Sequence, residues 1–347
     1  MVDGATAYPA TAASSRIRVS GHSPFLAGFG VDLRYRPALS ADEYALLQSP
    51  VSPARKAAVL GRSALRAVPA RHSNSLLLVH KLMLLAPLPG IDPPRRLDAY
   101  DFDDALTVGS ASATNERFQW VKQERRRAVA YMRHARLVLA ANSFLASQAR
   151  TYASRVEIVP SCIDPTAQPL REHRDRETLT IGWIGSRTTV AYLQPLLPVI
   201  ARMNEHGHHA RLVVVGGDTG HRAEWIEHRP WSLETQASDL AGFDVGVMPL
   251  PDDAWTRGKS GYKLLQYFSA GVPAVASPVG VNTELVASGR GATATTAAEW
   301  DHALTELLGD ASARRERGIT ARQFVESHYS YQRWAPELAD LLCSLAE

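Results

Sequence analysis

Two lysines and a glutamine follow a glycine-containing segment in the last third of the sequence. Lys259 lies between Gly258 and Gly261, and Lys263 and Gln266 lie on a short predicted helix. Cations beside a flexible loop can bind the oxygens of a diphosphate. The spacing therefore predicts a diphosphate clamp, to which Arg257 adds a third cation. The alternative is a set of exposed charges on a mobile surface loop.

A second phosphate signal follows an apolar run at residues 181–184. The run ends in Gly185, and Ser186 and Arg187 come next. Glycine allows a ligand to approach the backbone closely, and a helix beginning at Ser186 would present free N–H groups to a phosphate. A plain N-cap at this helix is the alternative. Pro195 and Pro198 predict that the helix is short or kinked.

Three carboxylates form a third group, Asp101, Asp103 and Asp104. An Asp-x-Asp pair after a strand resembles the nucleophile motif of haloacid-dehalogenase-like phosphohydrolases, with Asp218 as a possible magnesium ligand. Asp104 stands where that motif has glycine, and the lysine segment at 258–273 would then have no role. Otherwise these carboxylates orient an acceptor hydroxyl or amino group from a loop, or cap a loop or helix.

Short apolar runs alternate with amphipathic stretches along the chain. Continuous runs without polar alternation are typical of parallel strands that are covered on both faces. The sequence therefore predicts open α/β sheets, with strands at 76–80, 137–141, 156–159, 179–184, 210–215, 245–248 and 274–276 and helices at 116–135, 297–308 and 331–346.

Length and composition favour a globular protein of two domains. The 347 residues exceed what one hydrophobic core usually serves, and a charged segment with two prolines at 163–177 is typical of a linker. A net charge of +3 is too mild for a nucleic-acid binder. Two distant cysteines and no leader-like start favour a cytoplasmic protein without a disulfide framework.

Several other features have a simpler structural explanation. His80 ends a buried strand, where cleft residues gather, but a satisfied core histidine is the plainer interpretation. No His/Cys cluster has the spacing of a metal site. The glycines before Asp218 lack the Gly-x-Gly-x-x-Gly spacing of a nicotinamide enzyme.

The sequence resembles glycosyltransferases of family 4, which have the GT-B architecture. The segment Gly258–Pro273 carries most of the resemblance, with support from Gly182–Ser186 and from Ser277–Asn282 followed by Glu284. The first half is similar in outline to one bacterial branch at 14–16, 100–105 and 140–143. The Ala/Arg-rich composition also favours a bacterial source.

This resemblance implies an α/β fold of two Rossmann-like domains whose parallel sheets face a central cleft. It assigns residues 1–165 to an acceptor-binding domain, 178–328 to a nucleotide-sugar-binding domain and 329–347 to a C-terminal helix. It further implies transfer with retention at the anomeric carbon and no obligatory metal. Under this resemblance, a specialised metabolite and a cell-envelope glycan are both open as the acceptor.

The resemblance also assigns site residues. Many members carry two glutamates eight positions apart, where this sequence has Gly258 and Gln266. Gln266 would hydrogen-bond the ribose. Lys259 and Arg187 would act in catalysis, with Asp103 on the acceptor side. The donor site would comprise Gly185, Ser186, Arg187, Lys259, Lys263 and Gln266.

Two alternatives remain open under this resemblance. Some relatives dock on anionic membranes through a basic helix. A basic run here lies within one helical pattern, although a solvent-exposed helix face is the simpler explanation. The run comprises Lys122, Arg125, Arg126, Arg127, Arg133 and Arg136. The chain could also be a GT-B scaffold that binds a sugar nucleotide without transferring it. Gly258, and the lack of a visible first strand before Val19, motivate that hypothesis.

Overall fold

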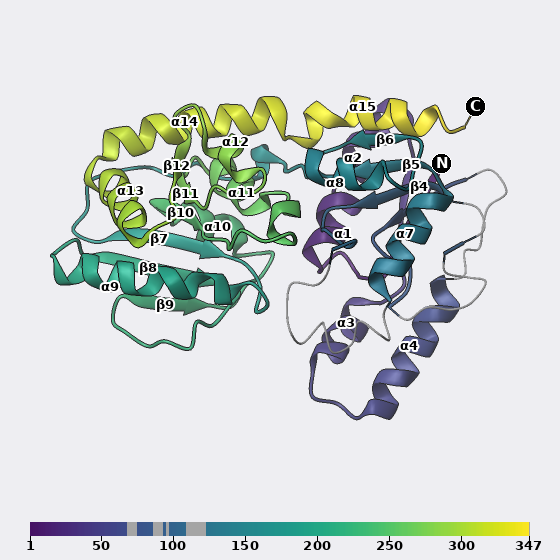
Figure 1. Cartoon of the computed structure of the whole chain (residues 1–347), viewed down its shortest axis with the longest axis horizontal. Coiled ribbons are helices and arrows are strands. Elements are labelled where there is room, and N and C mark those ends of the chain that lie inside the picture. Colours follow the sequence, from purple (N-terminus) through teal and green to yellow (C-terminus); the bar gives the residue numbers. More distant parts are fainter. Residues whose placement is uncertain (68–74, 86–92, 95–96, 109–122, 347) are drawn as a thin grey trace. The chain divides into compact units, whose positions relative to one another are not determined.

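The computed structural model describes residues 1–67, 75–85, 93–94, 97–108 and 123–346. It divides into two compact units (Figure 1). The first unit combines Met1–Cys162 with Tyr331–Glu347, and the second spans Ile163–Ser330. Each unit is built on its own sheet, so the predicted two-domain α/β class is confirmed. The cleft between the two sheets stays a prediction.

The first unit contains a six-stranded sheet in the order β2-β1-β3-β4-β5-β6, and all of its pairings are parallel. Its core is largely aliphatic and includes Val2, Leu78 and Leu137. The strands are β1 (Val2–Thr6), β2 (Leu33–Pro37), β3 (Leu76–His80), β4 (Leu97–Phe102), β5 (Ala135–Ala140) and β6 (Val156–Ile158).

Helices from both ends of the sequence cover this sheet. Helix α15 (Tyr331–Cys343) lies along α2 (Ser23–Leu26), and its Leu338 and Leu342 enter the core of the first unit (Figure 1). The predicted C-terminal helix is therefore present and packs on the first unit. The other α-helices are α1 (Ala13–Arg18), α3 (Ala41–Gln48), α4 (Pro53–Ala67), α7 (Glu124–His134) and α8 (Ser143–Ala149).

The expectation that no strand precedes Val19 is wrong. Strand β1 lies inside the sheet, between β2 and β3. Its residues Val-Asp-Gly-Ala-Thr have little β-propensity, which hides the strand from a pattern search. A Cβ on Gly4 would lie 2.6 Å from Val19 Cγ1, so glycine is needed for close packing. Asp3 is buried but pairs with Arg36 of β2 at 2.5 Å.

The second unit contains another six-stranded parallel sheet, in the order β12-β11-β10-β7-β8-β9. Strands β7, β8, β10 and β11 begin and end at the predicted residues, whereas β9 and β12 were not predicted. The strands are β7 (Leu179–Ile184), β8 (Ala210–Val215), β9 (Ile226–Arg229), β10 (Val245–Met248), β11 (Ala274–Ala276) and β12 (Gly291–Thr293).

Two hydrophobic clusters fill the second unit, one on each face of the sheet. One packs α9 (Leu197–Glu205) and α13 (Ala297–Gly309) against the strands. The other packs α11 (Tyr262–Ser269), α12 (Asn282–Val286) and α14 (Ala311–His328). This double covering explains why the strands have continuous apolar runs. The remaining α-helix is α10 (Gln236–Ala241).

The predicted linker has little regular structure and packs on the second unit. Beyond the short 3₁₀ turn Pro165–Ala167 it has no helix or strand. Arg171 pairs with buried Asp244 at 2.6 Å, and buried His173 hydrogen-bonds the Gly271 carbonyl at 2.8 Å. The segment is therefore fixed to this unit along its length.

Candidate functional site

The strand order of the second sheet reverses between β7 and β10. The chain builds β8 and β9 on one side of β7 and then crosses to β10 on the other side. In open α/β sheets, ligands bind beyond the carboxyl ends of the two strands at such a reversal. The loops that follow these strands are 185–189 and 249–261. The fold therefore brings the two predicted phosphate-binding segments to one edge of one sheet.

Gly185 begins the first of these loops and has no room for a side chain. Its amide donates to the Val215 carbonyl at 3.0 Å, which extends the pairing of β7 with β8. An added Cβ would lie 2.4 Å from the ring of Trp183 and 3.0 Å from Cε of Lys263. A Cβ on Gly216, which has a φ of 84°, would lie 2.3 Å from the Gly185 carbonyl oxygen. The backbone at this edge is therefore closely packed, and a side chain at residue 185 or 216 would disturb it.

Lys263 lies in the first turn of α11, and its ammonium lies over the ring of Trp183, 5.2 Å from the centroid. The side chain is half-buried. Burial and the nearby charge of Lys259 lower the pKa of Lys263 to about 8. Among the residues that the structure describes, its ammonium forms no ion pair or hydrogen bond. A desolvated cation without a carboxylate partner is suited to bind an anion.

Lys259 lies near the end of the loop that follows β10. Its ammonium is 4.9 Å from the ring centroid of Trp255, and its side chain is half-buried. The loop is held by internal bonds, because Asp253 accepts from the backbone N–H of Thr256 at 2.8 Å. Arg257 is exposed and bound to Asp252, with Nε 2.6 Å from Oδ1. The diphosphate clamp stays a prediction; of its three cations, Arg257 is paired with Asp252, whereas the two lysines lie over tryptophan rings.

The prediction of a helix that begins at Ser186 is wrong. Residues 187–189 form a turn, and a 3₁₀ helix follows at Val190–Leu196. The first α-helix is α9, which begins at Leu197. In an α-helix the ring of Pro195 would clash with the carbonyl of residue 191, which disfavours α geometry here. The Ser186 amide donates to Thr189 Oγ1 at 3.2 Å, and Arg187 is exposed.

Gln266 and the loop after β11 complete this edge. Gln266 is buried one helical turn after Lys263, on the same face of α11. Buried Asn282 donates to the Ser277 carbonyl at 3.1 Å, which leaves its Oδ1 without a hydrogen bond among the described residues. The ribose contact of Gln266 stays a prediction. Asn282 is an additional polar group, found in the motif but not assigned a role from it.

The carboxylates of the first unit lie at the carboxyl end of β4, one strand beyond the reversal of strand order between β1 and β3. Asp101 lies in β4 and is the last residue of that strand to pair with β3, and Asp103 and Asp104 follow β4. Lys81 bridges the last two, with Nζ 2.8 Å from Asp103 Oδ1 and 2.5 Å from Asp104 Oδ2. These two carboxylates raise the pKa of Lys81 despite its burial.

Asp101 has partners that argue against a nucleophile. Arg18 binds both of its oxygens, and His80 Nδ1 lies 2.7 Å from its Oδ2. Burial raises the pKa of Asp101, but the Arg18 charge and the His80 bond outweigh it, so the net pKa is well below its usual range. Among the described residues, no group of three His, Cys, Asp or Glu side chains is arranged to hold a metal. Asp101 therefore functions as a fixed anchor.

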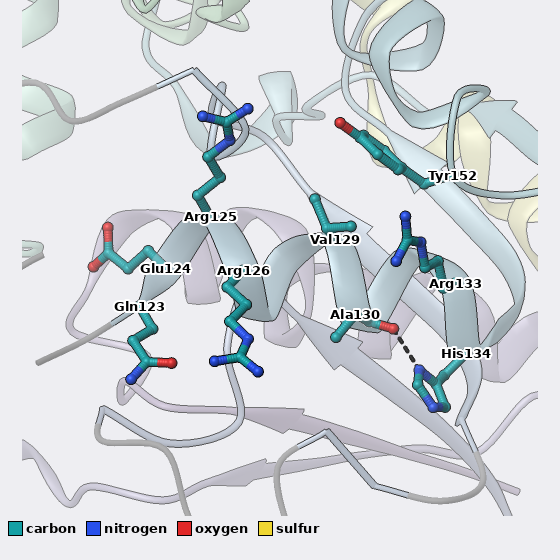
Figure 2. Close-up of a pocket in the computed structure, with 9 residues that line it drawn as sticks. All are labelled: Gln123, Glu124, Arg125, Arg126, Val129, Ala130, Arg133, His134 and Tyr152. Carbon is teal, nitrogen blue, oxygen red and sulfur yellow. Dashed lines mark hydrogen bonds between the residues drawn. The ribbon is translucent and has the colours of Figure 1, made fainter. Parts of the chain in front are cut away.

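The basic helix α7 forms one wall of a separate groove of about 800 Å³ (Figure 2). Arg125, Arg126 and Arg133 are exposed, and Arg133 lies over the ring of Tyr152. Arg127 points inward and donates to the Leu84 carbonyl at 2.6 Å. Lys122, the first member of the basic run, lies outside the described residues. The predicted helix thus has an outward basic face and an inward side that is fixed to the core.

The comparison with protein families decides the class of the second unit. Residues 178–310 match the family described as glycosyl transferases group 1. The second unit therefore contains a segment that is similar to group 1 glycosyl transferases. The match contains the loops after β7, β10 and β11, and therefore the whole lysine site. The finer assignment to family 4 stays a prediction.

Solved structures of glycosyltransferases have the same fold as the whole chain. WaaG, a glycosyltransferase involved in lipopolysaccharide biosynthesis, is 14% identical with a TM-score of 0.63. Sucrose-phosphate synthase from Thermosynechococcus elongatus is 14% identical with a TM-score of 0.72. Anabaena HepE in complex with UDP is 12% identical with a TM-score of 0.66. Each alignment covers 99% of both chains. The GT-B fold is therefore confirmed, and no curated protein matches the sequence.

Proposed function

We propose that this protein is a retaining glycosyltransferase that moves a sugar from a nucleoside-diphosphate sugar to an acceptor hydroxyl. The observation that carries the proposal is the ammonium of Lys263. It lies half-buried against Gly185 at the strand-order reversal of a glycosyltransferase domain. A diphosphate placed there would supply the anion that this cation lacks.

The site residues support transfer through stabilisation of the leaving group. As the bond between the anomeric carbon and the diphosphate oxygen breaks, negative charge grows on the diphosphate. Lys259, Lys263 and Arg187 would stabilise that charge, which is the role that an obligatory metal has in other enzymes. The acceptor oxygen forms the new bond on the same face of the sugar. Its proton passes to the departing phosphate oxygen, so no separate base is required.

The solved relatives support a uridine nucleotide and a glycan-type acceptor. HepE has been solved with UDP and with UDP and glucose, and TarM with UDP and α-GlcNAc-glycerol. By analogy we propose a UDP-sugar donor and an acceptor that is a cell-envelope glycan or a specialised metabolite. Asp103, held by Lys81, is the acceptor-side candidate.

We place the enzyme in the bacterial cytoplasm, with peripheral membrane contact through the outward basic face of α7. In the described part of the chain, none of the helices has the length and apolar character needed to cross a bilayer. Cys162 and Cys343 are both free, which agrees with a reducing compartment. The three outward arginines supply the charge that an anionic surface would attract.

Calorimetry with UDP and a panel of UDP-sugars tests the donor site. Lys263→Met should weaken binding roughly 10- to 100-fold, the scale of one lost charge-assisted bond. Arg211→Met is the matched control, because Arg211 is an exposed cation at the opposite, amino-terminal end of β8. Equal affinities in all three proteins would reject the site.

A non-catalytic scaffold is the second candidate, and Gly258 favours it. Residue 258 lies in a 3₁₀ turn and supplies no carboxylate to the donor sugar. Sugar release from the bound donor, measured with and without acceptors, separates the two functions. Tight donor binding without release or transfer would establish the scaffold.

A further inference from the structure

We infer that Arg18 is a positioning residue for the reaction: through Asp101 it fixes the ring of buried His80, so that Nε2 is presented to sugar hydroxyls. This inference rests on the proposed function. It assigns a polar subsite to the first unit, at the carboxyl ends of β3 and β4.

Arg18 holds Asp101 from a helix that is distant in sequence. Its Nε donates to Asp101 Oδ2 at 3.1 Å, and its second terminal nitrogen donates to Oδ1. The remaining terminal nitrogen donates to the Val159 carbonyl at 2.7 Å. Arg18 and Asp101 are 3% and 2% exposed, so water does not compete for these bonds. A bidentate guanidinium sets both the position and the plane of the carboxylate.

The fixed carboxylate then selects one tautomer of His80. Asp101 Oδ2 lies 2.7 Å from His80 Nδ1. An ionised carboxylate only accepts hydrogen bonds, so Nδ1 must carry the hydrogen. In the neutral ring, Nε2 is therefore the nitrogen with the free lone pair.

His80 Nε2 makes no hydrogen bond to any residue that the structure describes, although the side chain is 2% exposed. A buried nitrogen without a partner is costly in a purely structural histidine. Nε2 lies 3.9 Å from Asp103 Oδ1, which is too far for a hydrogen bond but places two acceptors side by side. Two neighbouring hydroxyls, as on a sugar ring, can donate one bond to each acceptor.

The network also fits its surroundings. His22 lies close to Arg18, and burial together with that charge lowers the pKa of His22 to about 3, so it stays neutral. Its ring packs edge-on against Tyr331 of α15 at 4.7 Å. His22 therefore carries no charge that could compete with Arg18 for the Asp101 carboxylate.

Two substitutions at His80 test which nitrogen functions. His80→Gln retains a polar atom near Nε2, and His80→Asn retains one near Nδ1. The assay is turnover of the UDP-sugar that the wild-type enzyme binds and hydrolyses. We expect Gln to retain at least tenfold more activity than Asn. A histidine that serves only to satisfy Asp101 gives the opposite order.

Variants of the anchor test the positioning role. In Asp101→Asn, the amide has only one acceptor oxygen for the Arg18 fork and for His80 Nδ1, so the ring is no longer held in one tautomer; nitrogen-15 NMR of the His80 ring measures the tautomer population directly. We expect a mixed tautomer population and a fall in kcat without loss of UDP affinity. Arg18→Lys retains the charge but loses the fork, and should give an intermediate effect.

The outcomes separate this inference from the proposed function. Absence of any UDP-sugar turnover by the wild type rejects the function, and the inference with it. Turnover that is equal in the two His80 variants, or an Nε2–H tautomer in the wild type, rejects the inference alone. Thermal unfolding and UDP calorimetry on each variant identify a misfolded protein. If a variant is misfolded, the tautomer of the His80 ring in the folded wild type tests the inference instead.

Discussion

The side chain of Lys263 lies directly against the backbone of Gly185, so that a Cβ on residue 185 would approach Lys263 Cε to 3.0 Å. Gly185 follows β7 and Lys263 lies in α11, so that β8, β9 and β10 separate the two residues in sequence. Their contact places a cation beside the carboxyl end of β7.

Gly185→Ala should weaken UDP binding and destabilise the protein. The new methyl would collide with the Trp183 ring at 2.4 Å and displace Lys263. Overpacking of this kind costs about 1–3 kcal/mol. Gly309→Ala is the control, since nothing lies within 4 Å of its added Cβ. Denaturant unfolding and calorimetry measure both effects, and equal values for the two variants would contradict the packing argument.

Donor affinity should fall as the pH rises above 8. The pKa of Lys263 is lowered to about 8 in the free protein, and a bound diphosphate would favour the charged form and raise it again. Below pH 8 the lysine is already protonated, whereas above it binding must take up a proton. Affinity should then drop by up to about tenfold per pH unit.

Calorimetry in buffers of different ionisation enthalpy measures how many protons the protein takes up when the donor binds. Lys263→Arg keeps the charge and should remove the pH dependence without abolishing binding. A pH-independent wild type would show that Lys263 does not contact the diphosphate.

Lys259→Ala should lower turnover by roughly tens to hundreds of fold, the scale of one lost charged contact in the transition state. Arg257→Ala is the matched control two residues away, because the Arg257 guanidinium is exposed and bound to Asp252. Steady-state kinetics on both variants measure the change in turnover. Unchanged kinetics in Lys259→Ala would remove that residue from the mechanism.

Gly61→Ala should stabilise the first unit by about 1 kcal/mol. Gly61 lies inside α4, where alanine has the higher helix propensity, and its added Cβ meets nothing within 4 Å. The unfolding free energy should rise while UDP affinity stays the same. A destabilised variant would indicate that this face of α4 is covered.

The sequence predicted those parts of the fold in which local pattern and burial agree. Strands β7 and β8 are continuous apolar runs because both of their faces are covered. Strand β4 escaped prediction because it contains Asp98 and Asp101, whose charges are acceptable only through partners such as Arg18. Strand β9 escaped prediction because it is half-buried at the sheet edge and mostly polar.

The site divides in the same way. The glycines and lysines could be found from spacing, because a phosphate-binding loop needs them near one another in sequence. Trp183 and Trp255, which lie beneath the two lysines, could not, since their ring positions depend on tertiary packing. Arg18 was equally hidden, because 83 residues separate it from Asp101.

The return of α15 to the first unit gives the chain an order of assembly. Leu338 and Leu342 belong to the same core as Val2 and Val19, whereas the second unit draws only on residues 163–330. On the ribosome, the second unit can therefore complete its interior first. The amino-terminal half, although synthesised earlier, must wait for the final helix to close its hydrophobic centre.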